Sequence, residues 1–177
     1  MKGKRFNVYK MTLLAILLAL AVALGVAESF LPPLGPVGGV RLGLANLLVL
    51  LCLYELGFFE ALFLDLAKVL LVNLLRGTFL QMGFWMSLAG ATASFLAMAI
   101  LCRFRFLTET GVSAVGSLLH TFAQVAVGAL ILGTPSVFYY YCFLMPVSLV
   151  TGVLMGLLAN RIRASKIIAR IKQNHGF

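Results

Sequence analysis

Residues 78–102 read TFLQMGFWMSLAGATASFLAMAILC, a run of 25 residues without a charged side chain. About 20 apolar residues in a helix cross the hydrocarbon core of a bilayer, so this run is long enough to span a membrane with some tilt. Within it Ala89, Ala93 and Ala97 recur every fourth residue, a spacing that brings small side chains to one helix face. The run predicts a transmembrane helix that packs closely against other helices.

The composition of the whole chain agrees with this prediction. Of its 177 residues, 62% are hydrophobic and 11% are charged, against about 25% charged in a soluble domain. These values exclude a soluble globular enzyme, a disordered chain and a disulfide scaffold. The net charge is +9, which in a membrane protein reports topology and contact with anionic lipid rather than nucleic acid.

The chain contains five further apolar runs. The six runs are numbered below in chain order, so residues 78–102 are the fourth. A stretch rich in proline and glycine, residues 31–39, follows the first run and opposes regular helix. Residues 161–177 form a basic, amphipathic tail, which we expect to lie along the membrane surface. We therefore predict an all-α polytopic membrane protein, a single domain over residues 1–177. Its six predicted transmembrane helices are residues 11–27, 38–54, 56–75, 78–102, 112–133 and 137–160.

The basic residues are distributed unevenly among the segments between these runs. Eleven of the 14 lie before the first run, between the fourth and the fifth, or after the sixth, and only Arg41, Lys68 and Arg76 lie elsewhere. Basic residues accumulate on the cytoplasmic side of membrane proteins. The sequence thus predicts a multi-pass protein of the cell membrane with both termini in the cytoplasm.

The third run carries charges inside an apolar segment. Asp65, Lys68 and Arg76 fall on one helix face, so Asp65 and Lys68 can pair. Either this face is a polar wall that meets a substrate, or the pair merely neutralises two charges. Glu55 and Glu60 lie off this face, and we expect them to meet solvent or a partner.

The fifth run has its own polar face, because Gly116, His120, Gln124 and Gly128 recur every four residues. Glycines at this spacing allow close helix approach and also leave space for a ligand. His120 and Gln124 either bond to a neighbouring helix or line a binding site. The apolar runs contain no second histidine, so we expect no metal site.

Further polar and aromatic residues are predicted to gather at the outer level of the bundle. Trp85 and Tyr139 there match an aromatic belt at the membrane interface. Together with Arg41, Arg76, Asn46 and Gln81 at the same level, they alternatively suit a site for a small anionic or planar ligand, the two arginines favouring an anion. For the second alternative we predict a pocket beneath the loop at residues 32–39, with His120 deepest. Its predicted substrate-binding residues are Arg41, Asn46, Arg76, Gln81, Trp85, His120, Gln124 and Tyr139.

Two other runs carry small residues in register. Ala15, Ala19 and Ala23 form a smooth stripe on the first run, and Gly152 and Gly156 do the same on the sixth. Such surfaces allow two helix backbones to approach closely.

Several motifs resemble the Gx transporter family, often labelled heptaprenyl diphosphate synthase component I. They are the segments at residues 39–46 (GVRLGLAN), 87–90 (SLAG), 120–124 (HTFAQ) and 132–140 (LGTPSVFYY). The resemblance spans residues from the first run to about 160. The family is similar to the substrate-binding S components of energy-coupling factor transporters, six-helix membrane proteins that capture micronutrients from outside. In those proteins a small-residue surface on the first helix contacts the transmembrane coupling subunit, and here it maps onto Ala15, Ala19 and Ala23.

The resemblance implies a substrate-binding subunit of an uptake transporter for a small micronutrient or an isoprenoid-related compound. Its partners would be a transmembrane coupling subunit and ATPases, since the chain has no phosphate-binding loop of its own. A solitary carrier, in which Asp65, Lys68 and His120 relay protons, is an alternative. Another is a non-catalytic membrane subunit of prenyl diphosphate or quinone synthesis. We expect no catalysis and no cofactor, because such synthases bind Mg²⁺ through aspartate-rich motifs and Asp65 is the only aspartate.

Overall fold

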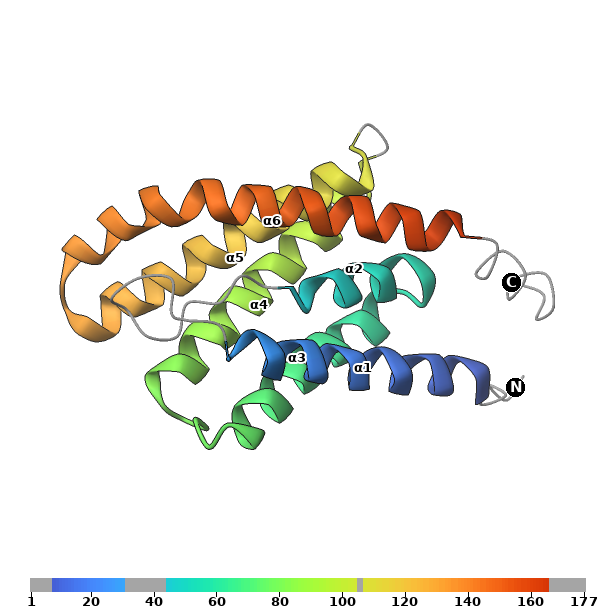
Figure 1. Cartoon of the computed structure of the whole chain (residues 1–177), viewed down its shortest axis with the longest axis horizontal. Coiled ribbons are helices and arrows are strands. Elements are labelled where there is room, and N and C mark those ends of the chain that lie inside the picture. The colour runs from blue at the N-terminus through green and yellow to red at the C-terminus, as the bar shows by residue number, and fades with distance from the viewer. Residues whose placement is uncertain (1–7, 31–43, 105–106, 166–177) are drawn as a thin grey trace, which may run out of the picture.

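The computed structural model describes residues 8–30, 44–104 and 107–165. In this part of the chain every regular element is helical, six α-helices and one short 3-10 helix (Figure 1). The prediction of six helices is confirmed. They are α1 (Val8–Glu28), α2 (Asn46–Glu55), α3 (Phe58–Leu75), α4 (Met82–Leu101), α5 (Glu109–Leu132), η1 (Pro135–Val137) and α6 (Phe138–Ala164).

Four of these segments are long and apolar enough to cross a membrane. They are Lys10–Glu28, Met82–Leu101, Glu109–Leu132 and Pro135–Ala164. Helix α3 has 18 residues but carries three ionisable side chains, and α2 has ten residues, a length of about 15 Å. The number of membrane spans and the cytoplasmic placement of both termini stay predictions.

Helix α1 begins and α6 ends at the same end of the bundle, hereafter the termini end (Figure 1). The opposite end is the far end. Helices α4, α5 and α6 pack as neighbours in chain order, while α1 packs mainly on α3. The short α2 occupies the half nearer the termini end (Figure 1), so its first residue, Asn46, lies near the middle of the bundle. The predicted span at residues 38–54 is therefore helical only from Asn46 onward in the part that the structure describes.

Glycines on α6 produce the closest helix contact. A Cβ atom built on Gly156 would lie 2.5 Å from the Cα of Thr110, and one on Gly152 would lie 2.7 Å from the Oγ of Ser117. Neither distance leaves room for a side chain, so the predicted close-contact surface on the sixth helix is confirmed, with α5 as its neighbour.

At the termini end, one arginine joins three helices. Arg163 of α6 donates from Nε to the carboxylate of Glu55 at 2.9 Å and pairs with Glu109 at the start of α5. Its guanidinium also lies 4.5 Å from the ring centroid of Tyr54. Glu55 is therefore a bundle contact rather than a solvated residue, which corrects the expectation from sequence. Residues 161–164 of the predicted surface tail continue α6, and residues 166–177 lie outside the described part, so the position of the tail stays a prediction.

Candidate functional site

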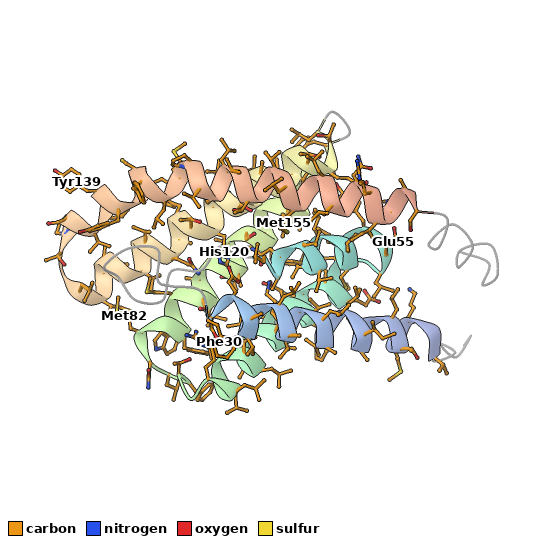
Figure 2. All side chains as sticks on the ribbon, viewed as in Figure 1. Phe30, Glu55, Met82, His120, Tyr139 and Met155 are labelled. Atoms are coloured by element: carbon orange, nitrogen blue, oxygen red, sulfur yellow. The ribbon has the colours of Figure 1, made fainter. Side chains whose placement is uncertain are left out.

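A cluster of polar side chains occupies the middle of this apolar bundle. Four helices contribute to it, and Figure 2 shows His120 near the centre of the molecule. All of its members are buried, with at most 7% of each residue exposed. The members are Asn46 of α2, Asp65 and Lys68 of α3, Ser94 of α4, and His120 and Gln124 of α5. We call this set the polar cluster.

The charged part of the polar cluster is a pair on α3. The Nζ of Lys68 lies 2.8 Å from Oδ1 of Asp65, so the predicted pairing is confirmed. Asp65 is 1% exposed, and neither of its oxygens accepts a hydrogen bond from any described residue. Among the described residues, the charge that holds this carboxylate is that of Lys68. Breaking such a pair leaves an uncompensated buried charge, which makes the two residues interdependent.

Lys68 also connects this pair to α2. Its ammonium donates to Oδ1 of Asn46 at 2.6 Å. The Nδ2 of Asn46 in turn donates to Oγ of Ser94 and contacts Nδ1 of His120, each at 3.2 Å. A chain of hydrogen bonds thus runs from α3 through α2 to α4 and α5.

The α5 part of the cluster closes this chain. His120 and Gln124 are one helical turn apart, and the Nε2 atoms of their side chains lie 3.0 Å from each other. His120 therefore contacts a neighbouring helix through one ring nitrogen and its own helix through the other. The predicted face of four residues is buried along its whole length, since Gly116 and Gly128 are buried as well.

A glycine on α4 makes room for this face. A Cβ atom on Gly90 would lie 2.7 Å from Cγ of Gln124 and 3.1 Å from Cε1 of His120. Only hydrogen fits at that position without moving one of the two side chains. Gly90 belongs to the segment SLAG that the sequence comparison singled out, and this contact gives it a physical role.

A small cavity of about 30 Å³ adjoins the polar cluster. It lies along the C-terminal part of α1, from Ala21 to Glu28, where that helix ends. By volume it holds roughly two water molecules, far less than the several hundred Å³ of a pocket for a whole metabolite. The lining comprises Ala21, Gly25, Glu28, Ala45, Asn46, Lys68, Val69, Val72, Ser87, Ala91, His120 and Gln124.

The structure brings three of the predicted substrate-binding residues together. Asn46 of α2 and His120 and Gln124 of α5 all line the cavity. Arg41 lies outside the described residues, as does the predicted lid at residues 32–39. Whether any of these residues binds a substrate stays a prediction.

The other predicted residues do not join them. Arg76 is half-buried at the end of α3, and it is not part of the cavity lining. Gln81 is exposed, and Trp85 is 47% exposed and packs its edge on Phe84. Tyr139 is 81% exposed and points away from the bundle at the far end (Figure 2).

The helical repeat explains this separation. On α4 the inward positions include Ser87, and Trp85 precedes it by two residues, about 200° around the helix. Trp85 and Tyr139 lie near the helix starts at the far end, as their sequence positions predict, but they lie on the outward faces of their helices. Their exposure matches the alternative of an aromatic belt.

The predicted substrate-binding residues omitted five polar members of the cluster or the cavity lining, Glu28, Asp65, Lys68, Ser87 and Ser94. The face of Asp65 and Lys68 was considered as a polar wall that meets a substrate, but neither residue was included among the predicted substrate-binding residues. For Ser87 and Ser94 a signal was present, because they lie seven residues apart on the face of α4 that also carries Gly90. No group of three potential metal ligands occurs among the described residues.

The predicted partner surface on α1 faces outward. Ala15, Ala19 and Ala23 are exposed, whereas Ala21 and Gly25 face the bundle. The stripe is thus not used for internal packing and presents a smooth strip of helix backbone.

The long apolar helices and the buried polar cluster are features of a membrane-associated helical protein. Within that class, residues 17–162 match the model of the family described as Heptaprenyl diphosphate synthase component I. The match covers most of the chain and every residue of the polar cluster, so the chain belongs to this family. No curated protein and no solved structure matches the chain.

Proposed function

We propose that the protein is the substrate-binding membrane subunit of an uptake transporter. The observation that carries the proposal is a cavity at the centre of an apolar bundle, lined by Lys68 of the charged pair and by the hydrogen-bonded Asn46, His120 and Gln124. The substrate would be a small micronutrient or an isoprenoid-related compound, and partner subunits would supply the energy.

The cost of the polar cluster supports this function. A charged residue near the centre of a bilayer costs roughly 2.5–3.5 kcal/mol on insertion scales, and such residues in membrane helices usually belong to substrate or ion pathways. Apolar residues of similar volume would fill the same space without that cost. A bundle that keeps Asp65 and Lys68 at 1% and 5% exposure is better explained by a ligand than by stability.

The outward alanine stripe supports the need for a partner. Ala15, Ala19 and Ala23 expose a strip on which a second helix can approach closely. The family description names a component, which also implies association with another subunit. In the proposed transporter this surface docks on the transmembrane coupling subunit, and ATPases complete the assembly.

The family description favours a second candidate function, a membrane subunit of a prenyl diphosphate synthase. In that case the chain would anchor a catalytic partner rather than catalyse the reaction. The one aspartate, Asp65, is buried in contact with Lys68 and cannot serve an aspartate-rich magnesium site. We therefore propose a non-catalytic role under either function. A solitary carrier would use Asp65, Lys68 and His120 as a proton relay, because Asn46 connects Lys68 to His120.

Affinity purification of the full-length chain from native membranes, followed by protein mass spectrometry, separates these functions. The transporter predicts a coupling subunit and ATPases, and Ala19→Trp should remove them. Leu130→Trp, at an exposed apolar position on α5, is the matched control and should retain them. Enrichment of a prenyl diphosphate synthase in place of ATPases would overturn the proposal.

A further inference from the structure

Each hydrogen bond of the polar cluster has an identifiable donor and acceptor, and this assignment indicates which chemical group of a ligand the cluster can bind. This inference rests on the proposed function, because it concerns the substrate class of the same cavity. It begins at Lys68, whose charge fixes the orientation of its neighbours.

The amide of Asn46 has one possible orientation. The ammonium of Lys68 can only donate, so the Asn46 atom 2.6 Å away must be the carbonyl oxygen. Its amide nitrogen then faces Nδ1 of His120 at 3.2 Å as a donor. Nδ1 must accept and therefore carries no proton.

The tautomer of His120 follows from this orientation. A neutral imidazole with an unprotonated Nδ1 carries its proton on Nε2, which then donates to Gln124, 3.0 Å away. Gln124 must present its oxygen to this proton. The side-chain amide of Gln124 is therefore turned by about 180°, so that Oε1 takes the position of Nε2 beside His120. The oxygen and nitrogen of an amide have nearly the same size, so both orientations fit the same space.

The hydrogen bonds run from Lys68 through Asn46 to His120, and this direction leaves hydrogen-bond donors on the cavity wall. Lys68 has three N–H groups, of which one bonds to Asn46 and one faces Asp65, and the third has no partner among the described residues. Asn46 and Ala45 also place the first turn of α2 on the lining, where the helix dipole adds a partial positive charge. A ligand group that meets Lys68 and the first turn of α2 must be a hydrogen-bond acceptor.

The charges of the described lining residues give no strong preference for an anion. Lys68 is the only cation among the described lining residues, and Asp65 lies 2.8 Å behind its ammonium and neutralises it. The other ionisable residue of the described lining apart from His120 is Glu28, an acid. Beside Lys68 a cation would meet N–H groups, and an anion would find no uncompensated cation among the described lining residues.

We propose that the cavity binds an uncharged carbonyl group of the substrate, with Lys68 as donor and Asp65 as its permanent counter-ion. The volume of about 30 Å³ matches one such group rather than a whole molecule. The proposal revises the anionic ligand that Arg41 and Arg76 suggested, because Arg76 is not part of the lining. It retains the planar alternative, since planar heterocycles commonly carry carbonyl groups.

Three probes of one shape test the charge preference: acetamide, acetate and acetamidinium. The full-length chain, labelled with ¹⁵N-histidine and held in lipid nanodiscs, contains only His120 and His175, so His175→Gln assigns the signals. We expect an unprotonated Nδ1 and a protonated Nε2 on His120. Acetamide should shift these signals at a concentration about tenfold or more below acetate and acetamidinium, because a charged probe is buried without compensation.

Asp65→Asn combined with Lys68→Met keeps the interior uncharged, so the variant remains foldable, and acetamide should no longer shift His120. Tighter binding of acetate or acetamidinium, no response to any probe, an unchanged acetamide response in the double variant, or a proton on Nδ1 would each overturn the proposal. If acetamide binds but no ATPase copurifies, the proposed transporter function is contradicted and the proposed carbonyl site holds. If ATPases copurify but a charged probe binds more tightly, the proposed carbonyl site is contradicted and the transporter function holds.

Discussion

At the scale of single residues, the buried polar side chains of the bundle are stabilised by one another. Asp65 has no hydrogen bond from any described residue, so its stability inside the bundle comes from Lys68. Lys68 in turn orients Asn46, and Asn46 orients His120. Sequence periodicity predicted the pair on α3 and the face on α5. It did not predict that Asn46 connects them, because this contact depends on where α2 begins.

The first prediction concerns this interdependence. Lys68→Met leaves Asp65 as an unpaired buried carboxylate and should lower the free energy of unfolding by about 3–5 kcal/mol. Adding Asp65→Asn should restore most of this loss, because no charge is then left in the interior. Reversible unfolding in mixed micelles measures both variants. If the double variant is less stable than the single one, the two side chains do not act as a pair.

The second prediction compares two glycines of α4. A methyl group at Gly90 would overlap Gln124 and His120, so Gly90→Ala should lower the free energy of unfolding by about 1–3 kcal/mol. A methyl group at Gly83 meets no atom within 4 Å, so Gly83→Ala is the matched control and should be neutral or slightly stabilising. Thermal unfolding of both variants in the same detergent is the measurement. Equal melting temperatures would mean that α5 does not approach α4 as closely as described.

At the scale of helices, apolar runs and their breakers predicted the number of helices well. Hydrophobicity does not encode which way a helix faces when most of its positions are apolar, and this is why Trp85 and Tyr139 were assigned to a wall they do not reach. Where small residues recurred every fourth position, orientation was encoded. The glycines of α6 face α5, and the alanines of α1 face outward.

The third prediction concerns the alanine stripe of α1. Ala19→Trp should abolish uptake, because an indole prevents the close approach of a second helix. Retention of small molecules by the isolated chain should be unchanged, since Ala19 is exposed and does not line the cavity. Leu130→Trp should affect neither property. Loss of retention in Ala19→Trp alone would mean that the stripe contributes to the interior of the bundle.

The fourth prediction concerns the junction of α2, α5 and α6. Arg163→Gln should lower the free energy of unfolding by about 1.5–3 kcal/mol, because it leaves Glu55 and Glu109 without their shared charged donor. Arg161→Gln, at an exposed position of the same helical turn, should have little effect. Melting temperatures in detergent check both variants. A loss of the same size at both positions would indicate a general effect of charge.

At the scale of the whole molecule, the start of α1 and the end of α6 lie at the same end of the bundle (Figure 1), and the polar cluster lies in the middle with the cavity beside it. Composition and the distribution of basic residues predicted the membrane and the direction from which a ligand would enter. The site itself was predicted in part, because Asn46, His120 and Gln124 meet while Lys68 was left out. The periodicity of polar and apolar residues along one helix does not show which residues of the other three helices it contacts.

The central claim is that the polar cluster holds a small molecule. Native mass spectrometry of the full-length chain, released from nanodiscs without added ligand, measures it most directly. We expect a bound small molecule on the wild-type chain and on Arg103→Ala, an exposed control, and its loss from Gln124→Ala. Equal retention by all three chains, or no bound molecule on any of them, would contradict the account.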